Sequence, residues 1–232
     1  MRSAGLGRRY VYDFNFAPVF ASFDQLLVGA WLTIRLSCAA MLLGLIVSIV
    51  CAWGKTSGPS LIRFVINAYI EIIRNTPFLV QIFFIFFGLP SLGLRLSPNS
   101  AALLALVVNF GAYGTEIIRA GIESIQKGQV EAGTALGLSR LQVFRYIIMK
   151  PAVRTVYPSL TSQFIYLMLT SSVVSVISAD DLAAAGNDLQ SATFASFEVY
   201  IVITLMYLAL SIGFSAIFAA IEKMAFKYPL SR

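Results

Sequence analysis

Five long stretches without a charged residue limit the possible folds of this chain more than any other feature. A helix needs about 20 residues to cross the hydrocarbon core of a bilayer, whereas a membrane barrel would show alternating segments of about ten. The chain of 232 residues is 58% hydrophobic and only 12% charged. We therefore predict an all-α integral membrane protein, with an N-terminal segment 1–23 and a five-helix domain 24–232. The stretches are Leu36–Gly54, Asn75–Leu94, Leu96–Thr115, Thr155–Ala179 and Val199–Ile221.

The composition argues against an enzyme. The chain contains no histidine, the commonest general base and metal ligand. Cys38 and Cys51 would lie about 20 Å apart along one helix, too far for an internal disulfide. The sequence Gly-Lys-Thr at 54–56 resembles the end of a phosphate-binding loop, but Ile49 stands where that loop requires its first glycine. We predict no catalytic residue, no metal site and no cofactor bound by this chain.

A basic amphipathic segment, residues 128–151, separates the third and fourth charge-free runs. Within it, Ala132, Ala135 and Leu136 recur at the spacing of one helix face, where small side chains would let a partner's backbone come close. Gly137 follows, and glycine readily takes the left-handed conformation in which many helices end. The segment therefore predicts a short helix that ends at a glycine corner.

The residues after this corner predict a second short helix. Ser139 has Gln142 three residues on, the spacing of a capping box. The second helix would carry Arg140, Arg145 and Lys150. With this segment in the cytoplasm, eleven lysines and arginines fall on the cytoplasmic side and four on the other. The positive-inside rule then predicts an extracytoplasmic N-terminus and a cytoplasmic C-terminus.

Three stretches resemble the permeases of ABC importers. GAYGTEIIRAGIESIQKGQVEAGTALGLS at 111–139 and FRYIIMKPAVRTVYPSL at 144–160 closely resemble their EAA-motif region. YIEIIRNTPFLVQIFF at 69–84 resembles the second span of the polar amino-acid branch. The resemblance covers most of the chain from about Gly29 onward. It implies the type I ABC importer permease fold and a multi-pass protein of the bacterial plasma (inner) membrane.

In the resembled family, the EAA segment forms a coupling helix that docks in a groove of a cytoplasmic ATPase. The resemblance places this helix over Glu131–Leu138, with Gly133 where a second alanine usually stands. The implied partners are a cytoplasmic ABC ATPase dimer that uses ATP, a second permease subunit in a homo- or heterodimer, an extracytoplasmic amino-acid-binding protein and membrane lipid, with no nucleic acid. The implied coupling residues are Glu131, Ala132, Gly133, Ala135, Gly137 and Arg140.

Polar residues at the start of the second run form a candidate substrate pathway. Glu71 and Arg74 lie at i, i+3, and the sequence Asn75-Thr76-Pro77 follows. Proline removes a backbone hydrogen bond and kinks the helix, so the freed carbonyls must face protein or water. The two charges either pair with each other or face a cavity. In a cavity, they and the carbonyls would complement the ammonium and carboxylate groups of an amino acid.

The fourth run has a polar stripe and an acidic end. Gln163, Ser171 and Ser175 lie along it, and serines on a membrane helix either mediate close packing or line a pathway. Asp181 stands before Leu182, where the resembled family commonly has an acidic residue. It either belongs to the pathway or caps a short helix in the outer loop. We include Gln163, Ser171, Ser175 and Asp181 among the candidate pathway residues.

Two other functional classes are alternatives. An integral-membrane enzyme would have to rely on Glu71 and the pair Asp180 and Asp181, and a simple channel would not explain the basic two-helix segment. The leading hypothesis is the permease subunit of an ATP-driven importer for polar amino acids. Because five spans are too few to enclose a pathway symmetrically, we expect two such subunits to pair about a two-fold axis. Because the chain has no phosphate-binding loop, its energy must come from ATPase subunits.

Overall fold

The computed structural model describes residues 12–226, and every regular element in that part of the chain is helical. The predicted all-α membrane fold is therefore confirmed. Residues 1–11 of the predicted N-terminal segment and the last six residues lie outside the described range. The elements are α1 (Ala17–Ala21), α2 (Phe23–Ser57), α3 (Ser60–Arg74), α4 (Phe78–Phe83), the π-helical η1 (Phe84–Gly88), the 3₁₀-helical η2 (Leu89–Leu92), α5 (Pro98–Glu123), α6 (Lys127–Ala135), α7 (Arg140–Gln142), the π-helical η3 (Val143–Ile148), α8 (Met149–Thr170), the 3₁₀-helical η4 (Ser171–Ile177), α9 (Leu182–Thr193) and α10 (Ser196–Ala225).

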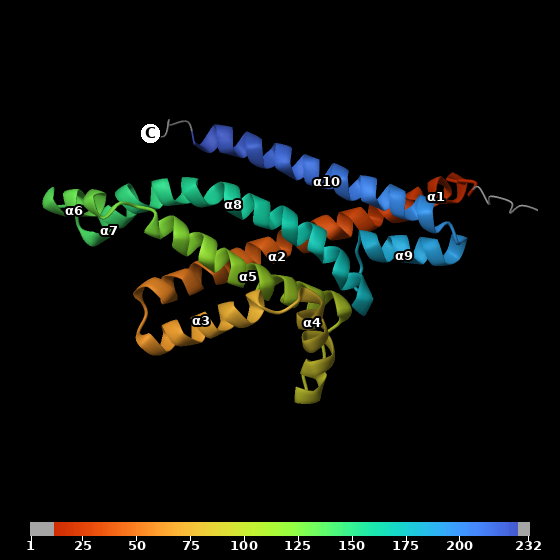
Figure 1. Cartoon of the computed structure of the whole chain (residues 1–232), viewed down its shortest axis with the longest axis horizontal. Helices are drawn as coiled ribbons and strands as arrows, with labels where there is room; N and C mark the ends of the chain where they lie inside the picture. The colour runs from red at the N-terminus through yellow and green to blue at the C-terminus, as the bar shows by residue number, and fades with distance from the viewer. Residues whose placement is uncertain (1–11, 227–232) are drawn as a thin grey trace, which may run out of the picture.

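Within the described residues, four helices are long and apolar enough to cross a membrane: α2, α5, the continuous run Arg140–Ile177, and α10. The fifth span is present only as a broken pair. The segments Ser60–Arg74 and Phe78–Leu92 meet at 111° across a short break. Proline at position 77 was expected to kink one helix, and instead it separates two helices that run in very different directions. Figure 1 shows α4 leaving the side of the bundle.

The helix that contains the fourth span extends further toward the N-terminus than the predicted span. The charge-free run predicts a span over Tyr157–Ser178, whereas the helix is continuous over Arg140–Ile177, and Pro158 does not end it. The π-helical turn η3 ends at Ile148, three residues before Pro151, and a wider turn of this kind absorbs a local change in the hydrogen-bond pattern without ending the helix. Membrane helices also tolerate proline where side chains satisfy the freed groups.

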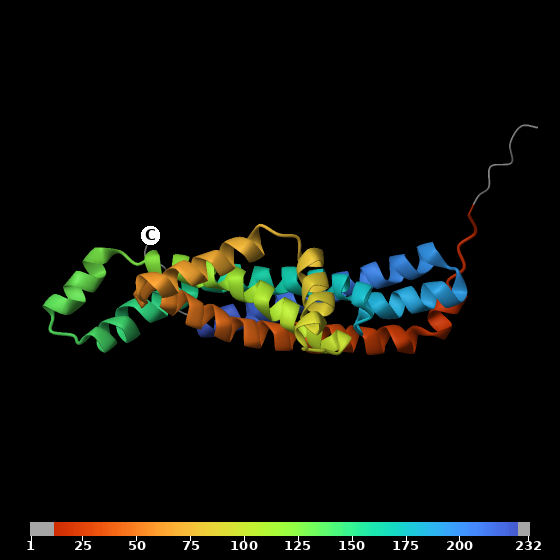
Figure 2. The same ribbon diagram turned by 90° about the horizontal axis from the view of Figure 1, so that it is seen from below.

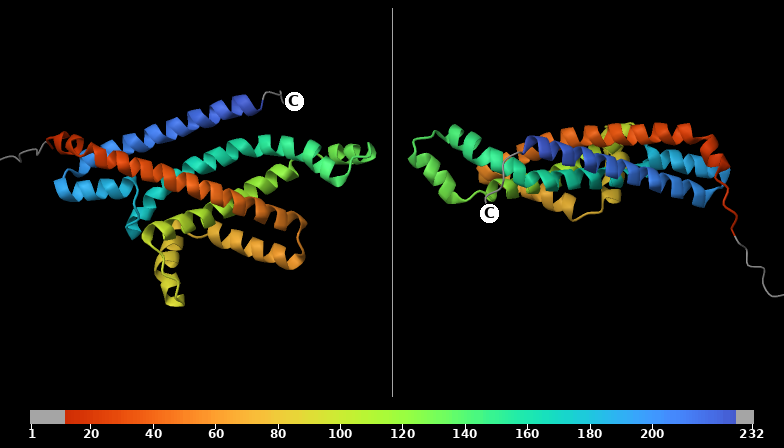
Figure 3. Two further views of the ribbon diagram at one scale, coloured as in Figure 1. Left: turned by 180° about the vertical axis from the view of Figure 1, so that it is seen from behind. Right: turned by 90° about the horizontal axis from the view of Figure 1, so that it is seen from above.

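Small residues let α2 and α5 pack closely at the centre of the bundle. A Cβ atom on Gly114 of α5 would overlap the hydroxyl of Ser48 on α2, and one on Gly44 would lie 2.9 Å from the ring of Phe110. The Ser48 hydroxyl donates to the carbonyl of Gly44 at 2.7 Å. Close approach of this kind is the usual way in which helices associate in lipid. Figure 3 shows α2 extending over much of the length of the molecule and crossing α5 near the middle.

The helices form an elongated bundle with different structures at its two ends. The pair α6 and α7 projects at one end, and α1 and α9 lie at the other (Figures 1 and 2). The last helix, α10, runs back toward the end that carries α6 and α7. The chain therefore places the start of its first span and the predicted coupling segment at opposite ends of the bundle.

Candidate functional site

The predicted glycine corner is present at the projecting end of the bundle. Helix α6 ends at Ala135, and Gly137 has φ +81°, in the left-handed region. The N–H of Gly137 donates to the carbonyl of Thr134 at 3.0 Å, and the N–H of Leu138 donates to the carbonyl of Gly133 at 3.2 Å. This pair of bonds is the Schellman motif, which satisfies carbonyls that the end of a helix leaves free.

The predicted capping box starts the second helix. The Gln142 side chain accepts from the N–H of Ser139 at 2.8 Å, and the Ser139 hydroxyl accepts from the N–H of Gln142. Together, the Schellman motif and the capping box join α6 to α7 in a hairpin, which we call the coupling hairpin (residues 127–148). Backbone hydrogen bonds before the corner and side-chain hydrogen bonds after it therefore define its shape.

The six predicted coupling residues do not share one environment. Gly133 is buried inside the hairpin, where a Cβ atom would overlap the Cδ1 atom of Ile147. The other five are exposed: Glu131, Ala132, Ala135, Gly137 and Arg140. Leu136 and Leu141, on either side of the corner, are 82% and 74% exposed. The hairpin therefore exposes small and apolar side chains at its surface, while Gly133 lets its two arms approach.

The two charges at the end of α3, just before the break in the second span, contact different partners. The Glu71 carboxylate accepts from the Asn75 side-chain amide at 2.8 Å. The Arg74 guanidinium lies over the ring of Tyr113 on α5, 5.4 Å from its centre. Neither charge is in an ion pair with the other in the described chain. The alternative that Glu71 and Arg74 simply neutralise each other is therefore wrong, and Arg74 uses an aromatic face.

The backbone carbonyls at the end of α3 are not free. The Thr76 hydroxyl donates to the carbonyl of Ile72 at 2.7 Å, and the Asn75 amide donates to that of Glu71 at 2.9 Å. The Gln81 amide donates to the carbonyl of Ile73 at 2.7 Å. The hypothesis that open carbonyls contact the substrate is therefore wrong for these three groups. Side chains cap them from within the protein, as the membrane interior requires.

Sequence analysis did not select Gln81 or Asn109, which hold this break to α5. The Gln81 amide nitrogen also donates to the carbonyl and hydroxyl of Thr76, both at 3.0 Å, and its oxygen accepts from the Asn109 side chain at 3.0 Å. Both side chains are buried, at 8% and 6% exposed. A carboxamide in each of two neighbouring apolar runs was the signal available, because a buried polar group must find a partner.

The polar stripe of the fourth span is satisfied mostly within its own helix. The hydroxyls of Ser171 and Ser175 donate to the carbonyls of Met168 and Ser172 at 2.7 and 2.8 Å. These bonds favour the packing role for both serines. Gln163 differs, because its buried amide nitrogen has no hydrogen-bond partner in the described chain. The two serine hydroxyls are therefore satisfied within the fourth span, whereas the Gln163 amide nitrogen is left without a partner among the described residues.

Asp181 caps the outer helix, as one of its two interpretations predicted. Its carboxylate accepts from the N–H of Ala184 at 2.7 Å and from the Tyr207 hydroxyl at 3.1 Å, and it is 1% exposed. Burial raises the pKa of this carboxyl to about 6, although both donors act in the opposite direction. The N–H of Leu182 donates to the Thr33 hydroxyl on α2. Asp181 therefore anchors the start of α9 against α10, and the adjacent N–H of Leu182 anchors it against α2.

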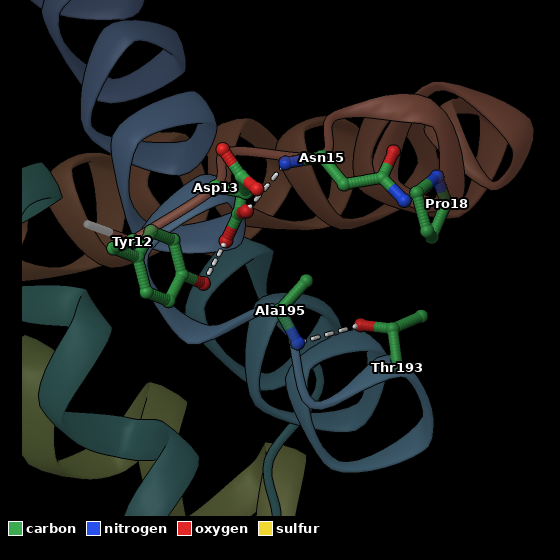
Figure 4. Close-up of a pocket in the computed structure, with 7 residues that line it drawn as sticks. Tyr12, Asp13, Asn15, Pro18, Thr193 and Ala195 are labelled. Atoms are coloured by element: carbon green, nitrogen blue, oxygen red, sulfur yellow. Dashed lines mark hydrogen bonds between the residues drawn. The ribbon is translucent and has the colours of Figure 1, made fainter. Parts of the chain in front are cut away.

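Two further features lie at the ends of the bundle. At the end with α1 and α9, a pocket of about 470 Å³ is lined by the first described residues and by the turn before α10 (Figure 4). There the Tyr12 hydroxyl and the N–H of Asn15 donate to the buried Glu198 carboxylate at 2.7 and 2.8 Å.

At the other end, Glu116 on α5 binds Lys55 on α2 at 2.6 Å and Arg119 at 2.9 Å.

Comparison with known proteins decides the family. A family model described as "Binding-protein-dependent transport system inner membrane component" matches residues 40–227. The chain belongs to this family. The glutamine transport system permease protein GlnP of Escherichia coli (strain K12) is 33% identical over 91% of this chain and 97% of its own length. The probable glutamine ABC transporter permease protein GlnM of Bacillus subtilis (strain 168) is 34% identical, over 87% and 93%.

Solved structures agree with this membership. An amino acid ABC transporter with histidines matches with a TM-score of 0.86 and 33% identity, covering 92% of this chain and all of the matched chain. The inward-facing MetNI methionine ABC transporter matches with a TM-score of 0.68 at 17% identity, which supports the fold alone. The predicted type I importer fold is confirmed, as is the prediction of a membrane transport component that is not an enzyme. The chain is a multi-pass inner membrane protein.

Proposed function

We propose that this chain is the transmembrane subunit of an ATP-driven importer for polar amino acids. Similarity to permeases for glutamine and other amino acids over more than nine-tenths of the chain supports this substrate class. The observation that carries the proposal is the coupling hairpin. It joins two helices at Gly137, projects from one end of the bundle and presents exposed Leu136 and Leu141. An apolar tip outside a membrane bundle favours a protein partner.

The partner of the coupling hairpin is a cytoplasmic ATPase dimer, which supplies ATP hydrolysis that this chain cannot perform. Glu131, Ala132, Ala135, Gly137 and Arg140 form the contact surface, and Gly133 supports it from inside. This arrangement requires the hairpin in the cytoplasm and the N-terminus outside, as the distribution of lysine and arginine favours. A second permease subunit completes the pathway, and an extracytoplasmic amino-acid-binding protein delivers the substrate to the end with α1 and α9.

The substrate passes the break between α3 and α4. Arg74 is exposed, and its contact with the Tyr113 ring leaves guanidinium donors available for a carboxylate. Glu71 and Asn75 are also exposed and offer oxygen atoms to an ammonium group. Thr76 lies beside them. An anion and a cation on one short segment match the two charges of an amino acid. Gln163, whose buried amide nitrogen has no hydrogen-bond partner within residues 12–226, extends this pathway along α8.

Amino-acid uptake by the reconstituted complex tests the proposal. The permease is expressed with its candidate ATPase and binding protein, reconstituted in vesicles, and supplied with a panel of labelled amino acids. We expect ATP-dependent uptake of a polar amino acid only when the ATPase is present, and mass spectrometry of the complex should identify the same compound. Uptake that is independent of ATP and of the ATPase would favour a channel and refute the proposal.

A further inference from the structure

The break in the second span needs an internal brace, because Pro77 leaves the end of α3 one hydrogen bond short. In a continuous helix, the carbonyl of Ile73 would accept from the N–H of residue 77, which proline lacks. The Gln81 amide donates to this carbonyl at 2.7 Å, from four residues beyond the proline. It also bonds both oxygens of Thr76. One side chain thus ties the end of α3 to the start of α4.

The hydrogen bonds determine how both amides are oriented. Carbonyl oxygens only accept, so the Gln81 nitrogen must face Ile73 and Thr76. The Gln81 oxygen then faces α5, and the Asn109 side chain must present its nitrogen to it, at 3.0 Å. A carboxylate in place of either amide would put two acceptors opposite each other. The arrangement therefore depends on these two amides and not only on their volume.

The face of α5 that carries Asn109 also contacts a charged residue next to the break, Arg74. Tyr113 follows Asn109 by four residues, one helical turn, so the two side chains lie on one face. Asn109 holds Gln81, and Tyr113 lies under the Arg74 guanidinium. A rotation of α3 at the break would therefore separate Arg74 from Tyr113 and break the bonds of Gln81 together.

We propose that Gln81 and Asn109 are positioning residues for substrate passage, a role that rests on the proposed function. Both are buried and do not touch the substrate. They hold α3 so that Arg74, Asn75 and Thr76 face the pathway in register with Tyr113 on α5. Loss of either amide lets the break rotate, and a complex that assembles normally then moves fewer amino acids for each ATP hydrolysed.

Three variants test this role in the reconstituted complex with its ATPase and binding protein. Gln81→Met and Asn109→Leu keep the volume and remove the hydrogen bonds, and the double variant removes both sides. We expect uptake per assembled complex to fall on the order of tenfold in Asn109→Leu, the effect of one lost buried hydrogen bond, and at least as much in Gln81→Met, which loses the bonds to Ile73 and Thr76 as well. Uptake per assembled complex in the double variant should be no lower than in the less active single variant, because the two residues act as one unit.

Ser48→Ala is the matched control. Ser48 is also buried and also bonds α5, through the carbonyl of Gly111 at 3.2 Å, but it does not contact the break. It should lower the yield of complex without changing the ratio of transport to ATP hydrolysis. A purely structural role predicts the same result for Gln81→Met, and normal transport per complex in that variant would overturn the inference.

Further variants distinguish a failure of assembly from a failure of the positioning role, and that role from the proposed function. If Gln81→Met does not assemble, Asn109→Leu decides, because it leaves the donor bonds of Gln81 to Ile73 and Thr76 in place. Normal transport per complex in Asn109→Leu would then refute the positioning role. Arg74→Gln distinguishes the two proposals: if it abolishes uptake while both amide variants transport normally, only the positioning role fails. If the wild-type complex moves no amino acid, the proposed function itself fails.

Discussion

Replacing Gly137 tests whether the coupling hairpin must keep its corner. The backbone there has φ +81°, and no atom lies within 4 Å of the position that a Cβ atom would take. A side chain would therefore meet no steric obstacle, and the whole effect would come from the backbone. For a residue other than glycine, the left-handed conformation costs roughly 1–2 kcal/mol. Asparagine should cost less and valine more, because asparagine tolerates this region and β-branched residues do not.

This free energy predicts how tightly the ATPase binds. If the ATPase recognises the bent hairpin, Gly137→Ala should weaken binding of the purified permease roughly 5- to 30-fold, which is the factor that 1–2 kcal/mol represents. The predicted order of affinity is wild type, Gly137→Asn, Gly137→Ala and Gly137→Val. Binding is measured with purified ATPase and permease in nanodiscs, and uptake in vesicles should follow the same order.

Gly128→Ala is the control for this series. Gly128 also has open space around it, but it lies within α6 and does not have a positive φ. It should bind the ATPase like the wild type. Wild-type affinity of Gly137→Val, or an equal loss in Gly128→Ala, would refute the reasoning, since neither result is compatible with strain at one corner.

Three further predictions concern the pathway, the bundle and the topology. Glu71→Gln should lower amino-acid uptake per assembled complex, because the ammonium group loses its anion, and unchanged uptake would end the case for Glu71 as a ligand. Glu116→Gln should lower the free energy of unfolding of the complex by about 1–3 kcal/mol more than Lys55→Met does, because Glu116 binds two cations. Equal melting temperatures of the two variants would contradict this prediction. In a cysteine-free background, an impermeant thiol reagent should label a cysteine at Ser3 but not at Ser231 in intact cells, and the reverse pattern would overturn the topology.

The sequence by itself determined the features that depend on a few neighbouring residues. Long charge-free runs require membrane helices wherever they pack, because the bilayer leaves no other way to satisfy the backbone. The positive φ of Gly137 and the capping box of Ser139 and Gln142 are likewise local, since each involves bonds within three to five residues. These predictions are confirmed because no distant partner was needed to make them.

Only the tertiary structure decided which polar groups meet across helices. Gln81 and Asn109 are 28 residues apart, and nothing near either amide reveals that α5 brings them together. Arg74 has an acidic neighbour at helical spacing, yet its guanidinium lies over the Tyr113 ring once α3 packs on α5. Gly133 looked like part of an outward face until the return of the chain placed Ile147 against it. Partner choice for a buried group depends on the packing of the whole bundle, and local spacing does not encode that packing.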